Sequence, residues 1–502
     1  MAPQPKTPGV YIVEKNAFPN AVVQVPTAVP AFIGHTERAQ RGAQDVTGKP
    51  VRLSSLNEYE GIFGGAPPTQ VTIENDALAF TEGSRFLLFH AMRMFFQNGG
   101  SNCYVVSVGN YEDAPTQAGL NGPLADDGPL AREAEPTMVV IPDAVLLEFA
   151  DWQGCSQQML KHCIKMQSRV AILDVHNGDA PRNDQDDVIT QFRTVKGDRA
   201  SFGIGYYPWV NTSLYGRETV SLDDVDADAR DVLGGLVEAD RDAAIAQLPA
   251  DDPRVATLTE SFDQLAAFIR VDSATADADE ATNRRESHLV ALQISPSYRD
   301  KMDEIREFLN VMPPAAAMAG VYSRIDNLFG VFKAPANTPI FGVISPTVSI
   351  TANEQEDLNV PFQGGIAVNA IRTFINQGVL VWGARTMDGN SQDWRYVNVR
   401  RTAIMLEQSM KNALNAYVFA PNTASTWTTV RNMLLNFLDN QWKAGALMGA
   451  TPEDAYAVDV GLGTTMTPND VLDGYMRIVV RVALVRPAEF IILTFQQKMP
   501  TS

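Results

Sequence analysis

Residues 138–174 read MVVIPDAVLLEFADWQGCSQQMLKHCIKMQSRVAILD, and this stretch decides the fold. Its two ends, Met138–Ile141 and Val170–Asp174, are short apolar runs rich in β-branched residues, as in buried strands. The intervening Phe149–Gln167 has the length and residue types of a helix. A strand, a helix and a second strand in this order predict an α/β unit.

The residues before this stretch predict a similar unit. Val29–Ile33 and Cys103–Val108 have the pattern of strands, and Ser54–Phe63 that of a short helix. Ser84 is placed as the N-cap of a second helix that ends at Gly99. That helix carries apolar residues on one face: Leu87, Ala91, Met94 and Phe95. The spacing predicts a right-handed crossover in a mixed sheet, so the fold class is α/β. A further strand is expected at Phe202–Tyr207.

Composition excludes several classes of protein. With 45% hydrophobic residues over 502 positions the chain can bury large cores, and about three domains are expected. The net charge of −19 argues against nucleic acid, which needs a basic surface, and against anionic membranes. The three cysteines and the N-terminal residues predict a soluble protein, made in a reducing compartment and without a signal peptide or membrane span.

The acidity belongs mostly to residues 216–312. They hold 22 Asp and Glu against 10 Lys and Arg, a net charge of −12 out of −19. We therefore expect a solvated outer module. Within it Arg230–Leu248 is predicted to be a helix that buries Val232, Leu236 and Ala243, and the small, charged residues 272–287 are expected to be mobile.

Two helices stand out near the C-terminus. Arg401–Tyr417 shows an apolar face made of Leu406, Met410, Ala413, Leu414 and Tyr417. Trp427–Lys443 begins at a Ser425 or Thr426 cap, ends at Gly445, and has an apolar stripe made of Trp427, Val430, Leu434, Phe437 and Leu438. Polar residues occupy the opposite face at helical spacing: Asn432, Asn436, Asp439 and Lys443.

Both chain ends contain strand-like runs outside these units. Residues 1–28 hold five prolines around Gly9–Val13, which fits either a disordered tail or an extended arm that adds a strand to a neighbour. Arg477–Val485 and Glu489–Phe495 are predicted strands, and Phe490–Phe495 carries no charge. It is either an internal strand of its own domain or a donated one.

The sequence offers little support for catalysis or metal binding. It contains no Gly-x-Ser-x-Gly elbow, and Asp174 and His176 are two residues apart on one strand, without the geometry of a catalytic relay. Cys155, His162 and Cys163 lack a fourth ligand and fit buried thiols better. The acidic residues 223–228 could bind calcium weakly, although a solvated face is favoured. No cofactor is expected.

Several blocks, in order along the chain, resemble the tail sheath proteins of contractile phages and related contractile injection systems. The blocks are Thr7–Tyr11, Ala31–Gly34, Met312–Asp326, Gly330–Asn337, Val368–Arg372, Gly378–Thr386, Asn398–Arg401, Trp427, Gly445–Gly449 and Arg486–Phe495. The resemblance implies a mixed-sheet inner domain built from N- and C-terminal segments, an inserted subtilisin-like α/β middle domain, and extended terminal arms. It also implies that the arms join adjacent subunits by β-augmentation.

Domain limits follow from this resemblance. We expect an N-terminal arm (1–28), a first part of the inner core (29–110), a middle or outer domain (111–345) containing the acidic insertion (216–312), a C-terminal inner domain (346–486) and a C-terminal arm (487–502). The N-terminal arm strand is placed at Val10, Tyr11, Ile12 and Val13, and the C-terminal one at Phe490, Ile491, Ile492, Leu493, Thr494 and Phe495.

The resemblance further implies a structural role. Identical subunits would stack as helical rings around an inner tube and contract, with baseplate and terminal cap proteins as further partners. The polar helix face made of Asn432, Asn436, Asp439 and Lys443 fits either a contact with the tube or a simply solvated surface, and we assign the tube contact to it. Assembly is expected in the bacterial cytoplasm, as part of a virion tail or an injection particle. The alternatives are a cytoplasmic α/β enzyme with an interdomain site, or another shell-forming protein.

Overall fold

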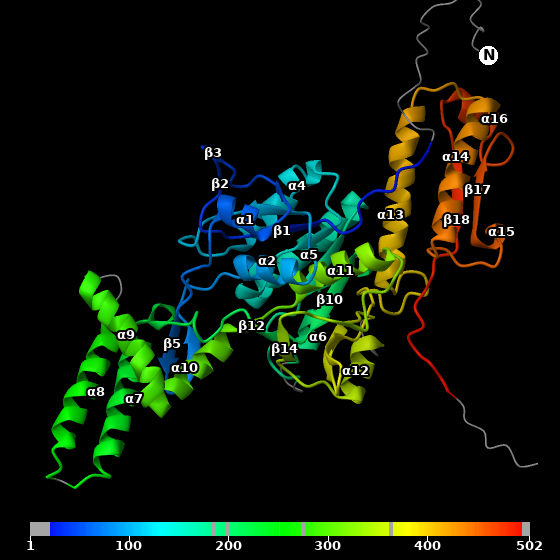
Figure 1. Ribbon diagram of the computed structural model, residues 1–502. Helices are drawn as coiled ribbons and strands as arrows, with labels where there is room; N and C mark the ends of the chain where they lie inside the picture. The colour runs from blue at the N-terminus through cyan, green and yellow to red at the C-terminus, as the bar shows by residue number, and fades with distance from the viewer. Residues whose placement is uncertain are drawn as a thin grey trace, which may run out of the picture. The chain divides into compact units, whose positions relative to one another are not determined.

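The computed structural model describes residues 21–182, 187–195, 200–249, 251–272, 277–360 and 365–493 (Figure 1). Within these ranges the chain forms two compact units. The larger unit consists of residues 26–401 and 486–493, and the smaller unit of residues 21–25 and 402–485. None of the described helices is both long and apolar enough to cross a membrane.

A nine-stranded mixed sheet forms the centre of the larger unit, which confirms the predicted α/β class. Its order is β13 (Thr338–Pro339), β16 (Gly378–Val381), β15 (Asn369–Phe374), β10 (Gly203–Tyr207), β9 (Val170–Asp174), β8 (Met138–Val140), β1 (Pro30–Gly34), β7 (Cys103–Ser107) and β4 (Val51–Leu53). The six strands from β15 to β7 are parallel. Antiparallel strands lie outside them on both sides. The strands in the middle are fully buried because helices cover both faces.

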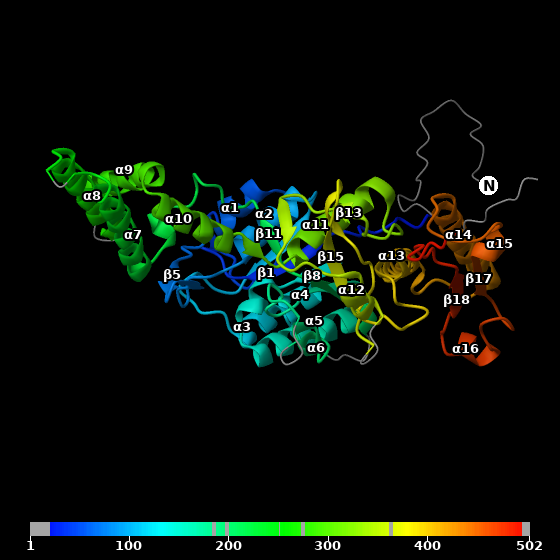
Figure 2. The ribbon, with the colours of Figure 1, turned by 90° about the horizontal axis from the view of Figure 1, so that it is seen from below.

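Helices occupy both faces of this sheet. Figure 2 shows α2 (Leu88–Gln97) and α11 (Ala315–Phe329) on one side and α5 (Phe149–Met166) on the other. The two α/β units predicted from sequence are therefore present, since α2 lies between β1 and β7 along the chain and α5 between β8 and β9. The short helix α1 (Leu56–Phe63) begins at its N-cap Ser55.

The predicted cap of α2 is wrong. The Ser84 hydroxyl donates to the carbonyl oxygens of Thr81 and Gln70, at 2.8 and 3.1 Å, so it closes a turn before the helix. A carboxylate from another strand end takes over the capping role: Asp143 accepts from Leu87 N at 2.8 Å. It also accepts from His35 N, at 2.8 Å. This buried side chain therefore joins three segments that are far apart in sequence.

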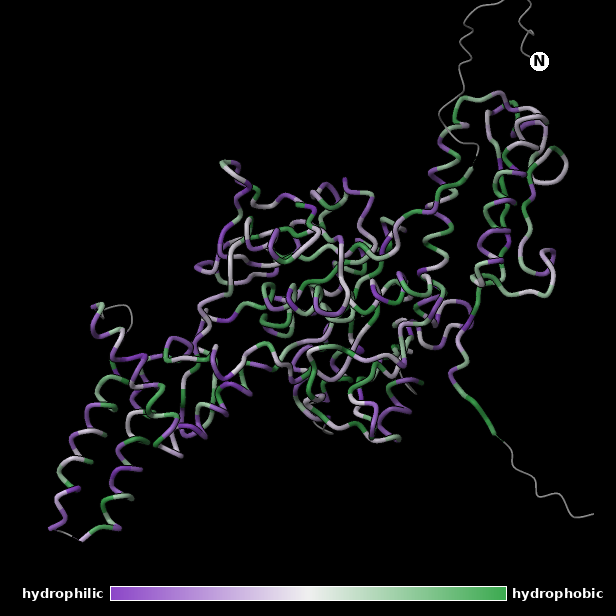
Figure 3. Tube along the Cα trace, in the orientation of Figure 1, coloured by the Kyte–Doolittle hydropathy of each residue, from purple (hydrophilic) through white to green (hydrophobic). Residues whose placement is uncertain are grey.

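The acidic insertion folds around a core of its own. Its helices are α7 (Ala227–Ile245), α8 (Arg254–Arg270), α9 (Ala278–Ile294) and α10 (Pro296–Leu309). The hairpin of β5 (Val71–Glu74) and β6 (Ala77–Phe80) joins that core: Val71 and Ile73 are buried there, and the Phe80 ring stacks on Phe308 at 4.4 Å. We call these four helices and the hairpin the insertion module. Figure 3 shows alternating apolar and polar residues along its helices.

Two expectations for the insertion module are wrong. The buried face of α7 carries Ala229, Leu233 and Val237. Of the three residues predicted to be buried, Leu236 packs against the core of the module, whereas Val232 is 37% exposed and Ala243 is exposed. Residues 278–287, which were expected to be mobile, are helical within α9; residues 273–276 lie outside the described ranges.

Both ends of the insertion meet at one point. Thr212 N donates to the Asn310 carbonyl oxygen at 2.8 Å. Beside them β11 (Val210–Thr212) pairs with β12 (Val311–Met312) and with β14 (Val343–Pro346). We call this Thr212–Asn310 contact a closed neck, because it joins the two ends of the insertion. The hairpin has a second closed neck, since Thr81 N donates to the Gln70 carbonyl oxygen at 2.9 Å.

The smaller unit holds the C-terminal helices. Helix α13 (Val397–Leu414) ends there, and α14 (Ala424–Lys443) packs on a hairpin of β17 (Tyr456–Val460) and β18 (Ile478–Val482). The predicted stripe is confirmed at Val430, Leu434, Phe437 and Leu438, which are buried. The N-cap of α14 is Thr423 rather than Ser425 or Thr426, because the helix begins at Ala424, three residues before the predicted start. Gly445, at φ +89°, follows its end as expected.

The boundaries of these two units differ from the domain limits expected from sequence. Strands from residues 29–110, 111–345 and 346–486 share one sheet in the larger unit, and the expected domain limits stay a prediction. The assignment of inner and outer layers, and the subtilisin-like topology of the middle domain, stay predictions.

Candidate assembly surfaces

The C-terminal segment leaves its own unit with apolar side chains in solvent. Phe490, Ile491, Ile492 and Leu493 are 71%, 85%, 91% and 75% exposed, respectively. Residues 486–493 form no strand, so the strand predicted from Glu489 is absent there, since no strand of the described residues pairs with this segment. Thr494 and Phe495 lie outside the described residues. The reading of Phe490–Leu493 as an internal strand of its own domain is thereby excluded.

A buried ion pair fixes the base of this segment. Glu489 accepts from Arg385 Nε at 3.0 Å and Nη2 at 2.6 Å, and from the Tyr396 hydroxyl at 3.1 Å. The Arg385 side chain is 3% exposed and also donates to the Asn359 carbonyl oxygen at 2.8 Å. We call Glu489 and Arg385 the C-terminal anchor. This pair was not predicted from the sequence, because the two residues lie far apart along the chain.

A second buried ion pair holds the chain where the N-terminal segment joins the larger unit. Asp326 and Arg401 pair at 2.6 Å and are only 3% and 4% exposed. The Thr27 hydroxyl donates to Asp326 at 2.6 Å, and Arg401 donates to the Thr27 carbonyl oxygen at 3.0 Å. Within the smaller unit, Val25 N donates to the Ser409 hydroxyl at 3.0 Å. The predicted arm strand Val10–Val13 lies outside the described residues.

The hairpin of the smaller unit can receive strands. Among the described residues, β17 and β18 pair only with each other as a sheet, so their outer edges are open except just beyond the end of β18, where Leu484 forms an isolated bridge with Leu447. The side chains of β18 alternate between half-buried and exposed, and Val479 is 44% exposed. An ion pair between Arg481 and Asp459 links the two strands. A two-stranded sheet with free edges is marginal on its own and is a ready template for further strands.

The polar face of α14 contains the four residues assigned to the tube. Asn432 and Asn436 are exposed, and the side chain of Lys443 is 65% exposed. Asp439 is only 30% exposed, because it pairs with Lys443 at 2.6 Å and accepts from the Tyr456 hydroxyl at 3.2 Å. The bond from Lys443 is the main reason that the pKa of Asp439 is lowered. The four residues share one face, but Asp439 already has intramolecular partners.

The structure gives the suspected catalytic and metal-binding residues other roles. Asp174 accepts from Ala315 N at 2.7 Å at the start of α11, and His176 Nε2 lies 2.9 Å from the Leu147 carbonyl oxygen. Burial raises the pKa of both Cys155 and Cys163 to about 12, so the thiols stay protonated. Within the described ranges, no three His, Cys, Asp or Glu side chains are grouped to hold a metal.

Comparison with known proteins places the chain among sheath structures. Residues 390–498 match the phage tail sheath C-terminal domain family. No curated protein matches the sequence. Three solved assemblies are similar over almost the whole length.

A chain of the anti-feeding prophage baseplate has 27% identity and a TM-score of 0.61, covering 99% of this chain and 100% of that one. A chain of the anti-feeding prophage helical sheath in its contracted state has the same identity and TM-score, covering 98% and 100%. A chain of the contracted sheath complex of PVC, an extracellular contractile injection system, has 25% identity and a TM-score of 0.59, covering 99% of both chains.

Proposed function

Because this chain is a sheath protein of the kind found in contractile injection systems, we propose that its copies polymerise as stacked helical rings around an inner tube and contract to drive that tube through a target envelope. The function then lies in contacts between subunits. No chemical step is needed, since the free energy would be stored in the interfaces of the extended polymer.

The observation that carries this proposal is the run Phe490–Leu493, which is exposed directly after a buried anchor. Four large apolar side chains in water are unfavourable for an isolated subunit, and each gains roughly 1.5–3 kcal/mol when buried. The C-terminal anchor fixes where the run leaves the subunit, while the run itself stays available to a neighbour. An anchored base and an exposed apolar end are the properties of a donated strand.

The receiver in this proposal is the β17–β18 hairpin of a neighbouring copy. Its two outer edges offer one place for a C-terminal arm and one for the N-terminal arm, predicted at Val10–Val13. Each main-chain hydrogen bond contributes only about 1 kcal/mol net, but the linkage repeats around every ring. Strand pairing fixes the arm at the hairpin, so globular surfaces can slide during contraction while the arms act as hinges.

Two truncations test this proposal. Removing residues 1–20, or residues 490–502 while keeping Glu489, should leave a folded subunit that forms no cylinders, because one strand of each linkage is lost. Negative-stain microscopy of the intact chain should show long hollow cylinders, whereas an enzyme would give compact particles and a capsid-like protein closed shells. Normal cylinders from either truncation would refute the role of that arm.

The remaining partners follow from the same proposal. The polar face of α14 (Asn432, Asn436, Asp439 and Lys443) contacts the inner tube, and the end rings contact baseplate and terminal cap proteins. The smaller unit belongs to the inner layer and the insertion module to the outer surface. Assembly takes place in the bacterial cytoplasm, before the particle is released or anchored.

A further inference from the structure

The two outer edges of the β17–β18 hairpin are not equivalent. In an antiparallel pair, residues that bond to the partner strand alternate with residues whose N–H and C=O groups point outward. Ala483 N donates to the Ala455 carbonyl oxygen at 2.9 Å, so these two residues form a bonded pair. The register of the hairpin then places the outward groups at Tyr456, Val458 and Val460 on β17, and at the residues opposite them on β18.

The edge of β17 is partly closed by the same subunit. Arg431, on α14, donates from Nε to the Val458 carbonyl oxygen at 3.0 Å, at the centre of the strand. At the start of the strand, the Tyr456 N–H donates to the Pro452 carbonyl oxygen. A strand added on this side would have to compete for both of these main-chain groups.

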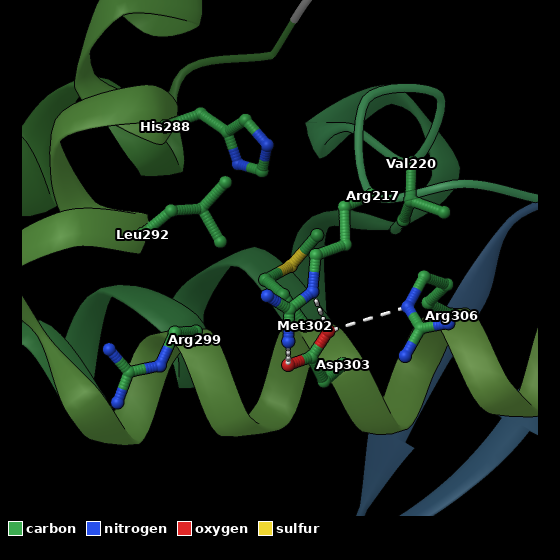
Figure 4. A pocket seen from close by; sticks show the side chains of 8 residues that line it. All are labelled: Arg217, Val220, His288, Leu292, Arg299, Met302, Asp303 and Arg306. Carbon is green, nitrogen blue, oxygen red and sulfur yellow. Dashed lines mark hydrogen bonds and ion pairs between the residues drawn. The ribbon is translucent and has the colours of Figure 1, made fainter.

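The bonding of Arg431 is unlike that of many arginines in this chain. Arg217 and Arg306, for example, both pair with the Asp303 carboxylate in the insertion module (Figure 4). Within the described ranges Arg431 has no carboxylate partner, and its single bond is the one to Val458. A charged side chain lying across a strand edge is one of the devices by which proteins prevent unwanted strand pairing.

The edge of β18 is open by comparison. No described residue bonds to the outward main-chain groups of Ile478, Val480 or Val482. The next bonded position is Ala483, whose carbonyl oxygen accepts from Met448 N at 2.7 Å. A strand can therefore be added along β18 without displacing another group.

We propose that Arg431 keeps the β17 edge closed until a second copy of the chain supplies its N-terminal arm. This rests on the proposed function, in which terminal arms pair with the hairpin. The longer run, Phe490–Phe495, fits the fully open edge of β18. The shorter run, Val10–Val13, fits the stretch of β17 that remains beyond Tyr456. The β18 edge is then filled first, and the second linkage requires the displacement of Arg431.

Fluorescence anisotropy of two labelled synthetic peptides tests this proposal on the full-length chain, at concentrations too low for assembly. One peptide covers residues 7–16 and the other residues 486–498. Arg431→Ala should bind the N-terminal peptide at least threefold more tightly than the natural chain does, because no side chain has to be displaced. The C-terminal peptide should bind both chains equally. Arg431 is exposed and alanine favours helix, so this variant keeps the fold.

Lys411→Ala is the matched control, because it removes one positive charge from an exposed helical position of the same unit. It should bind both peptides as the natural chain does. The proposal is overturned if Arg431→Ala binds the N-terminal peptide with unchanged or lower affinity, or if it changes the affinity for both peptides alike. If neither peptide binds to any of these chains, strand donation itself is refuted, and the proposed function fails together with the role of Arg431.

Discussion

At the scale of single residues, the most informative side chains are charges buried far from their sequence neighbours. The C-terminal anchor joins positions 104 apart in sequence, and the pair of Asp326 and Arg401 joins positions 75 apart. Buried ion pairs add little net stability compared with apolar packing, but losing one partner is costly because the other charge remains. Such pairs fix where a segment lies, which is what the base of an arm requires.

Glu489→Ala tests the C-terminal anchor. The buried Arg385 would keep its bond to Asn359 but lose its carboxylate, so we expect residues 486–489 to detach at a cost of roughly 3 kcal/mol. Hydrogen–deuterium exchange of the peptide covering these residues should become faster, with the central sheet unchanged. Asp393→Ala is the control, because Asp393 is 80% exposed and lies 3.9 Å from Arg486. Equal exchange in both variants would contradict the anchor.

A pH dependence follows from Asp174. Burial raises its pKa from 3.8 to about 7, although the bond from Ala315 N opposes the shift. Between these values the folded chain holds a proton that the unfolded chain has lost, so the contribution of Asp174 to stability falls as the pH rises through this window. Asp174→Asn should have near-normal stability at pH 4 and gain on the order of 2–4 kcal/mol at pH 8. Thermal unfolding at both pH values measures this. The prediction is refuted if the stability difference between the variant and the natural chain is the same at pH 4 and at pH 8.

At the scale of elements, sequence patterns succeeded where one segment determines its own structure. The strands β1, β7, β8, β9 and β10 follow from continuous apolar runs, and the buried stripe of α14 from its spacing. The predictions that failed involve partners that are distant in sequence. Ser84 caps no helix, because the Asp143 carboxylate accepts the hydrogen bond from Leu87 N. The buried face of α7 was misplaced by about one position, because Leu233 and Val237 have the same i,i+4 spacing as the predicted Val232 and Leu236, and only packing within the module selects between them.

The candidate site shows the same limit. The run Phe490–Leu493 and the polar face of α14 were visible in sequence, since a continuous uncharged run and helical spacing are local properties. Arg385, Glu489 and Thr27 were not identified, because only the folded chain brings them to their partners. The free edges of β17 and β18 also depend on what the rest of the chain leaves unpaired.

A further prediction concerns the binding of the inner tube by the polar face of helix α14. Exchanging the two charges, as Asp439→Lys with Lys443→Glu, preserves an i,i+4 pair and so costs the helix only a few tenths of a kcal/mol. It reverses the charge pattern of the helix face that we assign to the tube, so tube retention should fall at least tenfold while cylinders still form. Co-sedimentation of sheath with purified tube measures this. Lys411→Glu, at an exposed position of α13, is the control, and full tube retention in the exchanged variant would rule out the assignment.

At the scale of the whole molecule, the insertion module behaves as a domain made from two separate pieces of chain. Residues 71–80 contribute Val71 and Ile73 to its core, and Lys301 pairs with Asp76 at 2.7 Å. The limits predicted from the sequence, 216–312, leave out the hairpin, because charge and composition mark only the longer piece. Its core holds it together independently of the nine-stranded sheet.

Deleting parts of the module tests this description. Replacing residues 213–309 by a short glycine linker should give an aggregating protein, because the apolar side of the β5–β6 hairpin becomes exposed. Replacing residues 71–80 as well should restore a monodisperse protein that still forms cylinders. Size-exclusion chromatography and microscopy follow both outcomes. A well-behaved single deletion would show that the hairpin does not belong to the module.

The closed neck between Thr212 and Asn310 has a practical consequence. A foreign domain whose two termini lie close together could be grafted there in place of the helices, with the hairpin removed, without pulling the sheet apart. Every copy in a polymer would then display one foreign domain, at a regular spacing. The same geometry would allow related proteins to carry different insertions at this point while the nine-stranded sheet stays unchanged.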